Sequence, residues 1–267
     1  MIAALQMYDW PEVHGRIDAF WDRVSANLAA AGLDAPAALS RPDSISENWT
    51  NPDLLLGQTC GLPYVSGRCG DAVLVGRPVF GVAGATDGTY SSALICRKDD
   101  PATSLADFRG RKAAVNEYGS QSGCNALADA VLDVHCDAAS AFFGEVALSG
   151  AHRTSARMVA DAAADIAAID AVAWALFAEL DPDHHARLRV VAWTRPMPAL
   201  PFIVSKNLAT HRAILTQALT ESCCTGAAAP LPTAVKPAVD SDYDPIRQMN
   251  ARVRGLRLAA GATSLGT

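Results

Sequence analysis

Small polar residues gather at positions 118–130, in the run YGSQSGCNALADA. Ser120, Gln121 and Ser122 carry groups that hydrogen-bond a ligand oxygen, and Gly123 permits a tight backbone turn. A strand-like apolar run precedes these residues and a helix-compatible stretch follows them, which places them at a helix N-terminus. Unpaired N–H groups and the helix dipole favour an anion there. The run therefore predicts a cradle for an oxyanion or carboxylate; the alternative is that Ser120 or Ser122 only caps the helix.

A histidine and an aspartate occupy similar places further along the chain. His152 lies at the start of the predicted helix 151–162, beside Arg153, and Asp170 ends the buried strand 166–169. In open α/β sheets, ligands bind at the edge where strands end and helices begin. A histidine at such a place is either a solvated cap or a ligand donor. Arg153 beside it and the serine loop on the neighbouring strand–helix unit support the donor as much as the cap, so both interpretations stay open.

Other candidate binding residues follow predicted strands or lie in glycine-framed turns. Tyr8 and Asp9 end the first strand-like run, and Thr59 and Tyr64 lie in the turn 57–67. For Tyr64 the alternative is an ordinary half-buried aromatic. The full candidate set for ligand binding is Tyr8, Asp9, Thr59, Tyr64, Tyr90, Ser91, Ser120, Gln121, Ser122, Gly123, Asn125, His152 and Asp170. No catalytic residue, metal ligand or cofactor is expected, because no established catalytic or metal-binding motif is present in the sequence.

These residues require strands that alternate with helices. The clearest helix runs from Pro11 to about residue 31, because its apolar residues recur every three or four positions. Strands are predicted at 2–7, 53–56, 72–83, 93–96, 112–115, 145–148, 166–169, 190–193 and 202–205, and further helices at 104–110, 122–134, 151–162, 210–222 and 244–256, with an exposed connection at 225–237.

The composition describes a folded globular chain with an acidic balance. The 267 residues are 50% hydrophobic and 19% charged, and the formal net charge is −6. Nucleic-acid binding needs clustered Lys and Arg, which the sequence lacks, so nucleic acid is not expected as a partner. No apolar run reaches the roughly 18 residues that a membrane-spanning helix needs. The seven cysteines form no CxxC pair. Cys60 and Cys69 could bridge a loop if the protein were exported, although their spacing alone does not establish a disulfide.

Seven stretches together resemble the phosphate/phosphonate-type solute-binding proteins of ABC transporters. In chain order they are MYDWPE, GQTCGLPY, TYSSALICRKDDP, SLADFRGRKAAVN, SQSGCNAL, SGAHRTSARMVADAAADIAAIDAVAW and LPFIVSKNL. The resemblance covers nearly the whole chain and rests on the order and spacing of these stretches, since no single motif among them is decisive.

The resemblance implies the type II periplasmic-binding-protein fold, an α/β fold of two lobes with a ligand cleft between them. The implied lobes are 1–92 plus 205–267 and 97–200, joined by hinges at about 92–98 and 201–207. A phosphate- or phosphonate-like ligand would be held by Ser120, Gln121, Ser122 and His152, with Tyr8, Tyr64 and Tyr90 closing the cleft. The implied partners are this small anion and an ABC transporter permease.

The sequence departs from the family pattern in two places. Gln121 stands where relatives often have another hydroxyl, and the segment 197–201, MPALP, lacks the acidic residue that an amine-bearing phosphonate requires. The first residues also do not have the form of a secretion signal. A periplasmic location would need a start further upstream, and a cytoplasmic location is the alternative.

Two other classes of function remain open at this stage. One is a cytosolic enzyme on the same fold, like the menaquinone-pathway and thiamine-precursor enzymes, acting on a small carboxylate or phosphate. Asp9, Glu117, His152 or Asp170 would then supply an acid or base. The other is a sensory domain whose cleft regulates a partner. A binding protein without chemistry is the preferred interpretation, because the sequence offers no activated nucleophile.

Overall fold

The computed structural model describes residues 1–135 and 140–265, and the chain divides into two compact units. The first unit comprises Met1–Thr89 and Pro198–Asp244, and the second comprises Tyr90–Met197 and Pro245–Thr267. The chain therefore passes from one unit to the other three times. Among the described residues, no helix combines the length and the apolar character that crossing a membrane requires.

The first unit is built on a mixed five-stranded sheet in the order β1-β2-β12-β3-β13. β1 and β2 are parallel, whereas β12 is antiparallel to both β2 and β3. The strands are Ile2–Ala4 (β1), Leu54–Gln58 (β2), Val73–Val79 (β3), Phe202–Val204 (β12) and Ala234–Lys236 (β13), and the helices are His14–Ala30 (α1), Gly61–Val65 (α2) and Arg212–Ser222 (α7). β13 lies within the stretch predicted as an exposed connection, where it pairs with the edge of β3.

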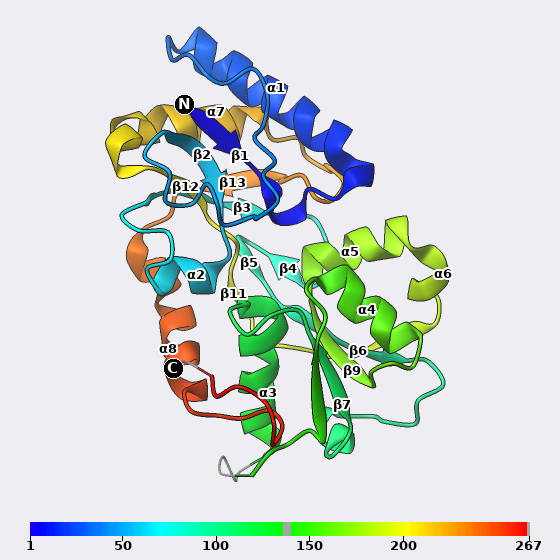
Figure 1. The fold of residues 1–267 in the computed structure, drawn as a ribbon. Helices are drawn as coiled ribbons and strands as arrows, with labels where there is room; N and C mark the ends of the chain where they lie inside the picture. The colour runs from blue at the N-terminus through cyan, green and yellow to red at the C-terminus, as the bar shows by residue number, and fades with distance from the viewer. Residues whose placement is uncertain (136–139, 266–267) are drawn as a thin grey trace. The chain divides into compact units, whose positions relative to one another are not determined.

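Helix α1 packs against α7 (Figure 1). Its predicted apolar face is buried, as the spacing of three and four residues requires: Ile17, Phe20, Trp21, Val24 and Leu28. The indole N–H of Trp21 donates to the carbonyl of Pro36 at 3.0 Å, which satisfies the polar group of this buried side chain.

The second unit contains another five-stranded sheet, in the order β10-β6-β9-β7-β8. β7 is parallel to β8 and β9, and β6 is antiparallel to β9 and β10. The strands are Ser92–Arg97 (β6), Lys112–Val115 (β7), Glu145–Leu148 (β8), Ile166–Asp170 (β9) and Leu188–Trp193 (β10), and the helices are Ala126–Val134 (α3), His152–Ala160 (α4), Ala171–Leu180 (α5), Pro182–His185 (α6) and Asp244–Val253 (α8). The predicted helix at 104–110 is a short 3₁₀ helix, Leu105–Phe108, with Ser104 and Asp107 forming a capping box.

The unit boundaries differ from the sequence expectation. Residues 92–98 were expected to form a hinge. They instead form β6, which lies inside the second sheet between β10 and β9, and its apolar residues are buried there. A small three-stranded sheet of Ala85–Thr86 (β4), Thr89–Tyr90 (β5) and Met197–Pro198 (β11) contains the first two passages.

The C-terminal segment also differs from the expectation, which assigned 205–267 to the first lobe. Residues from Pro245 onward belong to the second unit. Val253, Leu256 and Leu258 join the core formed by Phe108, Leu127 and other apolar side chains of that unit, which explains the assignment.

An ion-pair network anchors α8 to α3, which lie side by side in Figure 1. Asp129 has a side chain only 4% exposed and pairs with Arg252 and, at 3.2 Å, with Arg195. Asp133 lies one turn further on and pairs with the same two arginines at 2.7 and 3.0 Å, but its side chain is 51% exposed. The two carboxylates thus have the same partners and differ in burial.

We predict that Asp129→Asn lowers the free energy of unfolding by about 1 to 2 kcal/mol, because a neutral amide leaves two guanidinium groups partly unpaired at a buried position. The matched change Asp133→Asn should cost less than about 0.5 kcal/mol, since exposed ion pairs contribute little. Urea denaturation of both variants tests this contrast. Equal losses would show that burial does not decide the strength of these pairs.

Candidate functional site

The predicted anion loop lies between β7 and α3. The helix begins with a π-helical turn, Gln121–Asn125, which continues directly into α3. Ser120 is the N-cap: its Oγ accepts from the Gly123 N–H at 3.0 Å. The Ser120 carbonyl accepts from the N–H groups of Cys124 and Asn125. The N–H groups of Gln121 and Ser122 have no acceptor within the described chain, so they are available to a ligand.

The second serine has a different partner. Ser122 Oγ lies 2.8 Å from Nε2 of His152, the first residue of α4. Ser120 therefore caps the helix and Ser122 does not. The cap predicted for one of the two serines is Ser120, and Ser122 remains the candidate for binding an anion. Burial lowers the pKa of His152 to about 4, and the ring is neutral at pH 7.

Asn116 is a member of this cluster that the sequence analysis missed. Its Oδ1 is buried and has no hydrogen-bond partner within the described residues. A Cβ placed on Gly123 would stand 1.8 Å from this oxygen and 3.3 Å from Cε1 of His152. Asn116, Gly123 and His152 thus meet at one point. Its position in the sequence could have identified it, because Asn116 directly follows the buried strand β7, and ligands bind at the ends of such strands.

Two amide side chains of the candidate set face the interior. Gln121 is fully buried, and its Nε2 donates to the sulfur of Met249 on α8 at 3.0 Å. Asn125 is also buried and donates from Nδ2 to Oε1 of Gln121 at 3.1 Å. These contacts hold the π-helical turn in place, so we assign both side chains a positioning role.

Asp170 caps the next helix. Its Oδ1 accepts from the N–H groups of Val172 and Ala173 at 2.8 and 3.2 Å, at the start of α5. Ser91 lies beside it, since the Ser91 carbonyl accepts from Ala171 N–H at 3.2 Å. Tyr90, directly before Ser91, is the last residue of β5 and is buried. The capping bonds explain Asp170 without a ligand.

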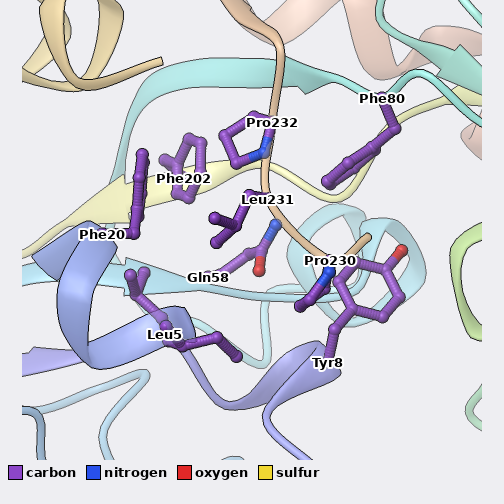
Figure 2. Close-up of a pocket in the computed structure, with 10 residues that line it drawn as sticks. Leu5, Tyr8, Phe20, Gln58, Phe80, Phe202, Pro230, Leu231 and Pro232 are labelled. Atoms are coloured by element: carbon purple, nitrogen blue, oxygen red, sulfur yellow. The ribbon is translucent and has the colours of Figure 1, made fainter. Parts of the chain in front are cut away.

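In the first unit, Tyr8 and Asp9 have structural partners. The Tyr8 ring meets Phe80 edge-on, with centroids 5.7 Å apart. Asp9 has a side chain only 4% exposed and pairs with Nε of Arg41 at 2.5 Å. Tyr8 also lines a cavity of about 20 Å³, which has room for about one water molecule. Figure 2 shows its wall of Phe20, Phe80, Phe202, Leu231 and three further apolar residues, Leu5, Pro230 and Pro232, with the Gln58 amide. This cavity is too small for an oxyanion.

Thr59 and Tyr64 are also engaged within the first unit. Thr59 is buried with its Oγ1 3.4 Å from Cys69 Sγ. Tyr64 donates from its hydroxyl to Asp240 Oδ1 at 2.9 Å. Cys60 and Cys69 are both buried and are not joined by a disulfide bond, and burial raises the pKa of Cys69. The four candidates of this unit therefore contact separate partners and do not converge on one another in the way that Ser122, Asn116 and His152 do.

Comparison with known proteins places the chain in a family. Residues 50–222 match the family described as the periplasmic substrate-binding protein of phosphonate ABC transporters. No curated protein matches the sequence.

Many solved structures share the fold, and three of them are described here. PhnD1 from Prochlorococcus marinus, in complex with methylphosphonate, superposes with a TM-score of 0.73 at 12% identity, covering 94% of this chain and 97% of that one. A binding component of the ABC phosphonate transporter from Pseudomonas aeruginosa gives 0.68 at 16% identity and coverage of 93% and 84%. The aliphatic sulphonate-binding protein SsuA from Escherichia coli gives 0.56 at 15% identity and coverage of 93% and 90%.

These similarities confirm the resemblance seen in the sequence and the type II periplasmic-binding-protein fold. They also confirm the function class, a solute-binding protein for a phosphonate-like ligand. The chain belongs to the phosphonate family of periplasmic substrate-binding proteins of ABC transporters.

Proposed function

We propose that Ser122, Asn116, His152 and the N–H groups of Gln121 and Ser122 bind a small phosphonate- or phosphate-like oxyanion. The observation that carries the proposal is the contact of Ser122 Oγ with His152 Nε2 at 2.8 Å beside an open helix start. Backbone N–H groups at a helix N-terminus bind an anion without any cationic side chain.

The charges around this cluster fit the same ligand. The Asp170 carboxylate is occupied by two backbone N–H groups of α5. Glu117 is exposed at the surface, and Gln121 directs its amide into the protein. Ser122 and Asn116 carry no charge and the His152 ring is neutral at pH 7, so the partial positive charge of the helix start determines the sign of the ligand.

A Ser–His pair also suggests the enzyme alternative, because a histidine base activates a serine nucleophile in many hydrolases. An efficient base has a pKa near the working pH, whereas burial lowers that of His152 to about 4. Within residues 1–135 and 140–265 no carboxylate orients the ring, since Nδ1 is buried without a hydrogen-bond partner there. Both features favour binding over catalysis.

We further infer that the protein works in the periplasm and delivers its ligand to an ABC transporter permease. The family match supports this inference. The inference requires an export signal on the gene product. Substrate-binding proteins of ABC transporters act by binding their ligand and delivering it to the permease in the membrane.

We predict that Ser122→Ala and His152→Ala each weaken methylphosphonate binding by about 1.5 to 3 kcal/mol, the range for a hydrogen bond to a charged group. Isothermal titration at pH 7 measures the loss. The two changes should not be additive, because both groups act on the same oxygen. Ser120→Ala is the matched control: it removes the cap, so about 1 kcal/mol of stability should be lost. Unchanged affinity in both Ser122→Ala and His152→Ala would refute the site.

We also predict that Gly123→Ala reduces methylphosphonate affinity at least tenfold. An added Cβ would stand 1.8 Å from Asn116 Oδ1 and force that side chain away from the helix start. Gly15→Ala is the control, because nothing lies within 4 Å of a Cβ at that position of α1. It should leave affinity unchanged and add about 0.5 to 1 kcal/mol of stability. Full affinity in Gly123→Ala would show that the close approach of Asn116 is not required.

A further inference from the structure

Arg77, on β3, is a partly buried cation of the first unit. Within residues 1–135 and 140–265 its guanidinium forms no hydrogen bond and no ion pair, and its Nε is shielded from solvent. The other partly buried arginines each have a partner: Arg16, Arg97, Arg111, Arg153, Arg189, Arg212 and Arg247. A shielded N–H donor without an acceptor costs free energy, and in a native protein it often marks a place where a ligand supplies the acceptor.

A second cation lies beside Arg77. The antiparallel pairing of β3 with β13 sets Lys236 directly opposite Arg77, and the two strands are neighbours in Figure 1. Residues directly opposite each other on adjacent strands project to the same face of the sheet, where two like charges repel each other. The Asp87 carboxylate forms its ion pair with the Lys236 ammonium and not with Arg77. The arginine therefore stays unpaired although the chain has a formal net charge of −6.

The turn that contains Asp87 and Gly88 packs closely against this guanidinium. Gly88 has a φ of +81°, and a Cβ added to it would stand 3.1 Å from Arg77 Nε and 3.4 Å from Arg77 Cδ. Glycine at this position therefore lets the turn lie directly against the arginine side chain. The two terminal nitrogens of Arg77 are not shielded as Nε is, so they are the atoms that a ligand can reach.

We propose that Arg77 and Lys236 form an anion-binding site of the first unit, separate from the cluster of Ser122, Asn116 and His152, and that it takes a small phosphate or carboxylate. The parallel N–H donors of a guanidinium match two oxygens of such a group, which a spherical ion such as chloride does not offer. The bound oxyanion supplies acceptors to Arg77 and reduces the repulsion between the two cations.

A binding role and a structural role for Arg77 have opposite consequences for the empty protein. If the side chain served only to stabilise the fold, its removal would lower the melting temperature. An unpaired, partly buried charge beside a second cation is instead destabilising until an anion binds, so its removal should raise the melting temperature. Natural sequences retain such local costs at functional positions.

The test uses full-length Ser122→Ala protein as the parent, in which the other proposed site is weakened. Arg77→Met is compared with this parent and with the control Arg68→Met, which removes an exposed arginine of the same unit. In potassium chloride, Arg77→Met should have a higher Tm than the parent. Replacing chloride by phosphate or acetate at constant ionic strength should raise the Tm of the parent and of Arg68→Met, but not that of Arg77→Met.

A titration of ¹⁵N-arginine protein with the same anions gives a direct readout. The Nε–H signal of Arg77, identified by its loss in Arg77→Met, should shift with phosphate or acetate. Asp87→Asn should increase the affinity about two- to fivefold, because it releases Lys236 from an exposed ion pair and makes it available to the ligand.

A lower Tm for Arg77→Met than for its parent would overturn the proposal, because it indicates a structural role. The proposal would equally fail if Arg77→Met kept the response to both anions, or if the Arg77 signal did not move. A response to only one of the two anions supports the site and identifies its ligand as a phosphate or a carboxylate. Because the parent already carries Ser122→Ala, none of these outcomes depends on the phosphonate site of the second unit.

Discussion

The hydrogen bond between Ser122 Oγ and His152 Nε2 joins two strand–helix units of the second sheet. Ser122 follows β7 and His152 follows β8, and these two strands are parallel neighbours. Parallel strands place their carboxyl ends at one edge of the sheet, which brings the two helix starts together. The contact also requires a residue without a side chain at position 123, because Asn116 and His152 occupy the space that a Cβ would need.

The remaining structure of the second unit holds this helix start in place. Met249 of α8 receives a hydrogen bond from Gln121, and Arg252 of α8 pairs with Asp129 on α3. The C-terminal segment thus braces the anion loop, although it is more than a hundred residues away in the sequence. The burial of Gln121 leaves backbone N–H groups, rather than its amide, to face a ligand.

The sequence predicted the features that depend on local pattern. The strand–loop–helix at 112–134, the place of His152 at the start of a helix and the strand ending at Asp170 all follow from apolar periodicity and punctuation by glycine and serine. Asn116 was missed because its importance comes from packing against Gly123, which a linear pattern does not express.

Tertiary contacts decided three questions that the sequence pattern left open: the roles of the two serines, the unit to which the C-terminal residues belong, and the partner of Asp9. The roles of Ser120 and Ser122 separated only when the acceptors of the Gly123 N–H and the Ser122 hydroxyl were known. The assignment of residues after Pro245 to the second unit depends on long-range burial of Val253 and Leu256. Asp9 looked like a ligand group at a strand end, yet it is paired with Arg41, a partner in a distant loop.

The most direct test is a crystal structure of the protein with methylphosphonate. The account predicts phosphonate oxygens within hydrogen-bond distance of Ser122 Oγ and of the N–H groups of Gln121 and Ser122, with the Asn116 amide turned toward the ligand. A phosphonate bound elsewhere, with the start of α3 empty and Ser122 still paired only with His152, would contradict it.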